Sequence, residues 1–305
     1  AFRSPRTCHI AAMSDPGIIF ERDLLRRRRE RAAATFADFD FLNREVAERL
    51  IDRLRDIRRN FPAVLDLGSH DGTLGRLLGP EFGVERVVST DLAEGFARRA
   101  PAPALAVDEE ALPFADASFD AVFSCLSLHW VNDLPGALIQ ARRSLRPDGL
   151  FLGAMLGGET LIELREALMA AEMAAAGGAS PRVSPFAEVR DAGALLQRAG
   201  FALPVADADT VTVTYENAWG LMRDLRGMGE TNVVAERHRQ PTRRDVLFRA
   251  AEIYQQRHAG ADGRIPATFQ VLYLTGWAPA PGQPKPLAPG SAEASLATLV
   301  GRDDG

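Results

Sequence analysis

The stretch that most constrains the fold runs from Ala63 to Gly72 and reads A-V-L-D-L-G-S-H-D-G. A short apolar run that ends in an acid and a glycine-containing turn is typical of a buried strand. Residues Thr73 to Leu78 then have the spacing of the first turns of a helix. A strand, a tight turn and a helix in this order open a doubly wound α/β sheet, which binds nucleotide-like ligands at such a turn.

The residues of the turn indicate which ligand it would bind. The dinucleotide fingerprint G-x-G-x-x-G, which places backbone N–H groups against a pyrophosphate, is absent. The turn carries Asp66, Gly68 and Gly72 instead, with His70 between the two glycines. A carboxylate at the end of the strand would repel a phosphate and suits a cationic ligand, such as one with a sulfonium and an ammonium group. The alternative interpretation is a turn that binds no ligand.

Further acids follow the next two predicted strands. The second strand, Val84 to Thr90, is followed by Asp91, nineteen positions after Gly72. In doubly wound folds an acid about twenty residues on binds ribose hydroxyls. Asp91 can also serve as the N-cap of a helix from Leu92 to Ala100.

The third strand, Ala104 to Val107, is followed by Asp108 and Glu109, which can accept the amino group of an adenine. A fourth strand spans Phe119 to Ser124 and a fifth spans Gly149 to Leu156. Acids after three strands all fall at the carboxyl ends, the ligand-binding edge of such a sheet. Together they favour binding of S-adenosylmethionine (SAM).

Composition excludes several classes of protein. The chain has 305 residues, 46% of them hydrophobic, and a formal net charge of −5, so it lacks the overall positive charge of a nucleic-acid-binding protein. The two cysteines, Cys8 and Cys125, do not suggest a disulfide framework and fit a reducing compartment. No apolar run reaches transmembrane length. Met13 is a candidate for the true first residue.

The residues before the first strand allow two interpretations. Asp15 to Thr35 contains a run of arginines and acids, which predicts either a solvated helix of mixed charge or a basic arm that docks an acidic partner. The aromatic residues from Phe36 to Phe41 belong to the core or cover the mouth of the cofactor site. The spacing of Val46, Leu50 and Leu54 predicts an amphipathic helix that packs on the sheet.

The second half of the chain predicts one helix from Thr160 to Ala175, with Thr160 as its cap, and another from Phe186 to Ala199. Two strands around a helical insertion follow. These strands would form the antiparallel hairpin that closes a seven-stranded, mostly parallel, Rossmann-like sheet. We therefore divide the chain as follows: an N-terminal arm, partly disordered or helical, over 1–35; a methyltransferase domain over 36–278, with lid or insertion segments at about 157–187 and 216–264; and a disordered tail over 279–305.

Several segments resemble a known family. The pattern D-x-G-x-x-x-G at Asp66 to Gly72 is similar to motif I of class I SAM-dependent methyltransferases, apart from His70, where that motif has glycine. The runs L-H-W-V-N-D-L-P from Leu128 and G-G-E-T-L-I-E-L-R from Gly157 resemble the mitochondrial complex I assembly factor 5 family. The likeness covers roughly residues 19–278. The malonyl-carrier-protein methyltransferase of biotin synthesis is a similar cousin.

The resemblance implies a class I methyltransferase fold that binds SAM and a role in maturing respiratory complex I, through arginine modification reported as hydroxylation. A complex I subunit would be the partner, with peripheral membrane association through that partner. The location would be the mitochondrial matrix in a eukaryote and the cytoplasm in a bacterium. The implied cofactor residues are Asp66, Gly68, Gly72, Asp91, Leu92, Asp108, Glu109, Ser124 and Leu126.

The candidates for chemistry are few. His129 and Trp130 lie just after the fourth strand, where substrate enters. His129 is either a base or substrate contact or a packed histidine beside Trp130, and Trp130 is likewise either a substrate contact or a packed side chain. Neither histidine spacing nor a catalytic triad motif predicts a metal site or a nucleophile. Three functions remain open: an enzyme that modifies a complex I subunit, a methyltransferase for a small acyl or carrier-protein carboxylate, and a non-catalytic SAM-binding assembly chaperone.

Overall fold

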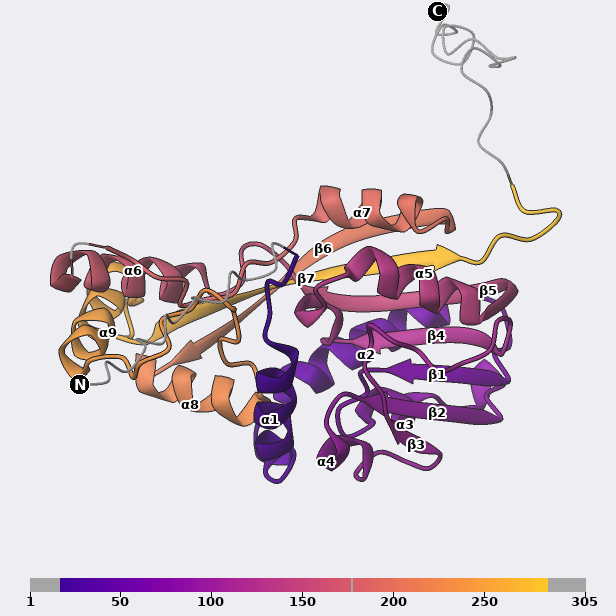
Figure 1. Ribbon diagram of the computed structural model, residues 1–305, viewed down its shortest axis with the longest axis horizontal. Coiled ribbons are helices and arrows are strands. Elements are labelled where there is room, and N and C mark those ends of the chain that lie inside the picture. The colour runs from indigo at the N-terminus through magenta and orange to yellow at the C-terminus, as the bar shows by residue number, and fades with distance from the viewer. Residues whose placement is uncertain (1–16, 177, 285–305) are drawn as a thin grey trace, which may run out of the picture.

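The computed structural model describes residues 17–176 and 178–284, and these form the predicted α/β fold. The strands are β1 (Ala63–Leu67), β2 (Arg86–Asp91), β3 (Ala104–Ala106), β4 (Phe119–Cys125), β5 (Leu145–Leu156), β6 (Ala202–Tyr215) and β7 (Ile265–Trp277). They make one sheet in the order β3-β2-β1-β4-β5-β7-β6 (Figure 1). Strands β1 to β5 pair in parallel, and β7 runs antiparallel to β5 and β6. The predicted sheet and its closing hairpin are confirmed.

Helices cover both faces of the sheet. They are α1 (Arg22–Ala32), α2 (Phe41–Arg55), α3 (Thr73–Leu77), α4 (Glu94–Ala97), α5 (Leu134–Ser144), α6 (Ile162–Ala176), α7 (Val189–Arg198), α8 (Ala218–Met228) and α9 (Arg244–His258), with 3-10 turns at Phe36–Asp38, Pro80–Phe82 and Leu128–Trp130. Leu50 of α2 belongs to the core of one face with Phe123 of β4, whereas Leu138 of α5 and Leu196 of α7 belong to the core of the other. Burial of these apolar side chains supplies the main driving force for folding.

The hairpin β6–β7 extends beyond the parallel half of the sheet. Both strands extend past the carboxyl ends of β1 and β4, and α6, α8 and α9 gather around the projecting part (Figure 1). Helices α8 and α9 lie between the two strands in sequence, and α6 packs against α9. Helix α1 contacts α4 and α8, so it spans from the parallel half of the sheet to this helical cluster.

Several predicted element boundaries are wrong. The helix predicted from Leu92 to Ala100 is the single turn α4, and the helix predicted from Phe186 begins at Val189. Thr160 does not cap α6, which begins at Ile162. Its hydroxyl instead donates to the carbonyl of Gln270 in β7 at 3.1 Å, because the chain there still lies beside the sheet.

Some predictions concern residues outside the described ranges, namely 1–16 and 285–305, which include Cys8, Met13 and most of the predicted tail. Within the described ranges, no helix combines the length and the apolar character needed to cross a membrane.

Candidate functional site

The predicted acids gather at one edge of the sheet. Asp66 in β1 pairs in register with Ser89 of β2, and Asp91 is the last residue of β2. Asp108 and Glu109 follow β3, which pairs in parallel with β2. The order β1, β2, β3 of parallel strands therefore brings carboxylates from distant chain positions to a common edge.

Asp66 is fully buried and only partly hydrogen-bonded. Its Oδ2 accepts from the Gly75 N–H at 3.2 Å, while its Oδ1 has no partner within the described residues. Burial raises the pKa of Asp66 to about 7, because desolvation disfavours the charged form. This carboxyl group would be stabilised as an anion by a further donor or a cation.

The turn after β1 keeps its left-handed geometry despite the histidine. Gly68, His70 and Gly72 have φ angles of 69°, 51° and 83°. A Cβ on Gly68 would lie 2.1 Å from the Ser127 Oγ, so only glycine fits there. His70 does not face solvent: it is 3% exposed and stacks on Phe36 with centroids 5.3 Å apart. Burial and then the charge of Arg29 lower the pKa of His70 well below its usual range.

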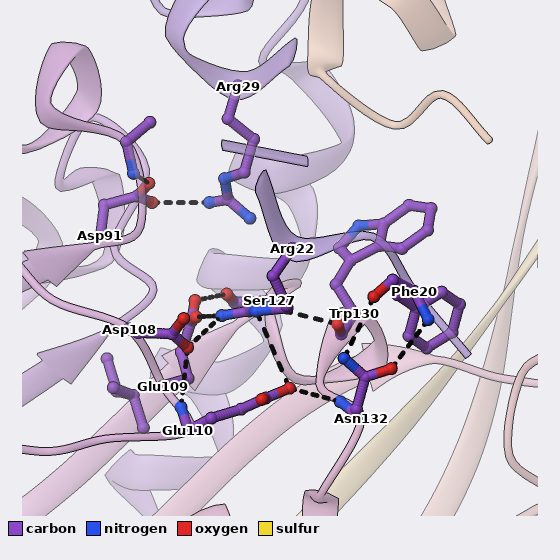
Figure 2. Close-up of polar contacts among 12 residues, drawn as sticks. Phe20, Arg22, Arg29, Asp91, Asp108, Glu109, Glu110, Ser127, Trp130 and Asn132 are labelled. Carbon is purple, nitrogen blue, oxygen red and sulfur yellow. Dashed lines mark hydrogen bonds and ion pairs between the residues drawn. The ribbon is translucent and has the colours of Figure 1, made fainter. Parts of the chain in front are cut away.

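Asp91 is paired with an arginine of α1. One Arg29 nitrogen donates to its Oδ2 at 2.6 Å, and the side chains are 2% and 0% exposed (Figure 2). The backbone N–H groups of His70 and Ala93 also donate to this carboxylate. Burial raises the pKa of Asp91 to about 6, although the Arg29 charge opposes that shift. The N-cap of α4 is Ala93, so the capping interpretation of Asp91 is wrong.

A second arginine of α1 occupies the acids after β3. Arg22 donates to Asp108 at 2.5 Å and to Glu109, whose other oxygen accepts from the Ser127 hydroxyl at 2.5 Å (Figure 2). Glu110 lies 3.8 Å from the same guanidinium. Burial alone would lower the pKa of Arg22, but the negative charges of Glu109 and Asp108 outweigh this effect and raise it.

The prediction of a solvated helix is therefore wrong for the inner face of α1. Arg22 and Arg29 point into the acidic edge, while Arg26 and Arg31 on the outer face are exposed. The prediction of a basic arm that docks on acids applies, but the acids belong to the same chain. Residues seven apart lie on one helix face, which is a signal in the sequence that the arginine run concealed.

The segment before α1 is anchored by the region after β4. The Asn132 Oδ1 accepts from the N–H groups of Ile19 and Phe20 at 2.8 and 2.7 Å. Phe20 packs edge-on against Trp130 with ring centroids 5.4 Å apart. Glu30, at the other end of α1, accepts from the Gly95 N–H at 2.8 Å. Both ends of α1 are thus held over the carboxyl edge.

His129 and Trp130 meet a carboxylate that the sequence did not reveal. Both the His129 Nε2 and the Trp130 Nε1 bond to the Glu230 Oε2, at 3.0 and 2.9 Å. The Leu156 N–H approaches the His129 Nδ1 at 3.4 Å, which makes Nδ1 the acceptor and Nε2 the protonated nitrogen. Glu230 follows α8, a hundred residues from Trp130, so no local spacing could have indicated it.

The remaining predicted cofactor residues line the sheet edge. The Ser124 hydroxyl donates to the Leu67 carbonyl at 2.8 Å, and Leu126 is buried with φ 51°. Leu92 is half-buried and packs on the apolar cluster around Trp130. The prediction did not name Ser127, which contacts Glu109, and it gave Phe36, which stacks on His70, only as part of the core or as a cover of the site's mouth.

A cavity of about 630 Å³ adjoins the Glu230 cluster. It is lined by residues of α1, α6, α8, α9 and the segment after α8. The apolar part of the lining includes Leu156, Leu161, Leu164, Leu168, Phe186, Met222, Leu225, Leu247 and Phe269. Such a volume is typical of ligand pockets. Across the described part of the chain, no group of three or more His, Cys, Asp or Glu side chains is placed to hold a metal ion.

Comparison with known proteins identifies the family of this chain. A family model for a methyltransferase domain matches residues 65–153. The arginine-hydroxylase NDUFAF5 of Danio rerio mitochondria is 43% identical over 288 residues, which cover 92% of this chain and 89% of that protein. The chain belongs to the NDUFAF5 family.

More distant relatives share the fold. The malonyl-[acyl-carrier protein] O-methyltransferase of Gallionella capsiferriformans is 32% identical over 277 residues, covering 86% of this chain and 93% of that protein. A Haemonchus contortus phosphoethanolamine N-methyltransferase, solved with S-adenosylhomocysteine, has a TM-score of 0.50 at 16% identity, covering 85% of this chain and 60% of that one. The present chain, a member of the NDUFAF5 family, therefore has the class I methyltransferase fold.

Proposed function

We propose that this protein binds SAM at the carboxyl edge of β1, β2 and β3 and modifies an arginine side chain of a complex I subunit. The observation that carries the cofactor assignment is Asp66, a buried carboxyl group with one unpartnered oxygen and a raised pKa. A ligand with ammonium and sulfonium groups would stabilise its ionised form. The identity to NDUFAF5 over most of both chains supports the acceptor.

The other residues of the edge fit the same cofactor. Asp91 would accept hydrogen bonds from the ribose hydroxyls, and Asp108 and Glu109 would accept one from the adenine amino group, once Arg29 and Arg22 release these carboxylates. Gly68 has no room for a Cβ because the Ser127 side chain, which donates to Glu109, packs against it. SAM, when bound, supplies an activated methyl group on a sulfonium, and this chain's residues bind and orient it.

Cofactor binding requires an exchange at Asp91. Its Oδ2 now accepts from Arg29, and its Oδ1 accepts from the Ala93 N–H. Ribose hydroxyls and the Arg29 guanidinium therefore compete for one carboxylate. Release of Arg29 requires α1 to shift or the side chain to rotate away.

Glu230 is the group that would hold an acceptor guanidinium. It is the acid among the residues that line the cavity, and the indole of Trp130 lies beside it. Carboxylate and aromatic partners both favour a guanidinium. Because the His129 Nε2 bonds to Glu230, we assign His129 the role of positioning that carboxylate.

The partner and location follow from the same proposal. We expect the protein to meet its complex I subunit in the bacterial cytoplasm or the mitochondrial matrix, at the membrane only through that partner.

The test is mass spectrometry of complex I from a strain that lacks the gene. Complementation with the wild-type chain should restore one modified arginine, carrying an added oxygen or methylene, and Glu230→Gln should restore much less. Unchanged arginine masses in the deletion strain would refute the acceptor assignment. A requirement for the protein with no modified residue would favour the assembly chaperone.

A further inference from the structure

Positive charge is in excess among the residues that line the cavity. Five of them are arginines, which we call the rim: Arg28, Arg182, Arg226, Arg237 and Arg239. Arg182 pairs with Glu172, while Arg237 and Arg239 share the single carboxylate of Glu21, at 3.0 and 2.9 Å. The described carboxylates therefore leave part of this positive charge uncompensated.

Arg28 shows the imbalance most clearly. It donates to the Thr231 hydroxyl at 2.9 Å and to the Asn232 carbonyl, and neither group is charged. Burial lowers the pKa of Arg28, and the charges of Arg237, Arg31 and Arg226 lower it further, against only a partial opposing effect of Glu21. A half-buried cation beside other cations would be stabilised by an incoming anion.

Arg226 is the second arginine of the rim that has no carboxylate partner within the described ranges. It is exposed near the end of α8, a helix that contacts α1. Arg28 and Arg226 come from different helices, so two anionic groups, or one extended anionic segment, can contact both.

One carboxylate lies among these arginines in the cavity lining. Glu230 uses its Oε2 for Trp130 and His129, which leaves Oε1 available for a further donor. A purely anionic ligand would be repelled by this carboxylate. A ligand that carries both carboxylates and a guanidinium matches both charges, and its apolar parts match the leucine-rich lining.

We propose that the cavity binds a polypeptide segment in which acidic and apolar residues flank the acceptor arginine, with the acids contacting Arg28 and Arg226. The proposal rests on the assignment of arginine as the acceptor. It identifies the rim as the feature that selects one arginine among the many of a protein substrate. Rim contacts of this kind act through charge complementarity and weaken with salt.

Fluorescence anisotropy tests the proposal on the full-length protein without cofactor. The probes are two labelled peptides of the same apolar residues around one arginine, flanked by glutamates in one and by glutamines in the other. We expect the acidic peptide to bind about tenfold more tightly at low salt. Arg28→Gln and Arg226→Gln should each remove most of that preference, and Arg143→Gln, an exposed arginine of α5 outside the cavity, should not.

Equal binding of the two peptides, or an unchanged preference in both rim variants, would overturn the proposal. Displacement of the acidic peptide by a malonyl thioester would also overturn it and would indicate a small acyl acceptor. Thermal unfolding of each variant shows whether it is folded. Because no cofactor is present, peptide binding can succeed where SAM binding fails, and the two proposals are judged separately.

Discussion

The guanidinium of Arg29 lies 2.6 Å from the carboxylate of Asp91, and neither side chain is more than 2% exposed. A buried ion pair is sensitive to the loss of one partner, because the other charge then remains desolvated. The pair links the N-terminal helix to the acid that we assign to the ribose. Helix stability and cofactor binding are therefore coupled at this carboxylate.

The first prediction concerns that coupling. Asp91→Ala should lower the free energy of unfolding by about 3–5 kcal/mol, because Arg29 is left without its carboxylate. Arg29→Ala/Asp91→Ala should cost less than the sum of the single changes. Urea unfolding of the wild-type chain, the two single variants and the double variant measures the free energy of unfolding of each. Additive effects would show that the two residues are not coupled.

The second prediction concerns competition. Arg29→Met removes the guanidinium but keeps an unbranched side chain against Phe96, so S-adenosylhomocysteine should bind more tightly, by about tenfold if one charged hydrogen bond no longer has to be broken. Arg31→Met, on the exposed face of the same helix, is the matched control. Calorimetric titration measures both, and weaker binding by Arg29→Met would mean that Arg29 contacts the cofactor instead of competing with it.

The third prediction concerns pH. The pKa of Asp66 is raised from 3.8 to about 7, so its protonated form is favoured in the folded state. Its contribution to stability is present below the unfolded pKa and is lost as the pH rises through about 7. Asp66→Asn should flatten part of this decline, and Asp91, with a pKa of about 6, should account for the remainder. Unfolding midpoints of the wild-type chain and of Asp66→Asn, measured between pH 3.8 and about 7, give the decline of stability with pH in each protein. Identical declines in the two proteins would contradict the assignment.

The fourth prediction concerns the histidine in the turn. His70→Gly restores the usual glycine but removes stacking on Phe36 and Phe96. We expect a loss of about 1–2 kcal/mol of stability, which is less than a full aromatic deletion because glycine relieves the positive φ. Binding of S-adenosylhomocysteine should remain, and its loss would give the imidazole a direct role.

The sequence was most informative where chemistry follows strand order. Asp66, Asp91 and Asp108 could be placed at one edge because parallel strands in a doubly wound sheet end together. The residues that were missed depend on contacts between distant segments. Glu230 reaches Trp130 only after the hairpin and its insertion have folded, and no periodicity encodes that approach.

Helix α1 shows a different limit. Its sequence does not distinguish exposed arginines such as Arg26 from Arg22 and Arg29, whose pairings depend on where the helix docks. Asn132 fixes that position through the backbone of Ile19 and Phe20, a contact across more than a hundred residues. The identity of the docked face therefore required the tertiary structure.

The most direct test of the account is calorimetric titration of S-adenosylhomocysteine into Arg29→Met and Arg29→Met/Asp91→Asn. Arg29→Met leaves the buried Asp91 carboxylate with only the N–H groups of His70 and Ala93 as donors, whereas the double variant removes both charges, so thermal unfolding first shows that each protein is folded. The account predicts saturable binding to the first and a loss of roughly 10–150-fold in the second, the value of a charged hydrogen bond. Equal affinities, or no binding to Arg29→Met or to the wild-type chain, would contradict it.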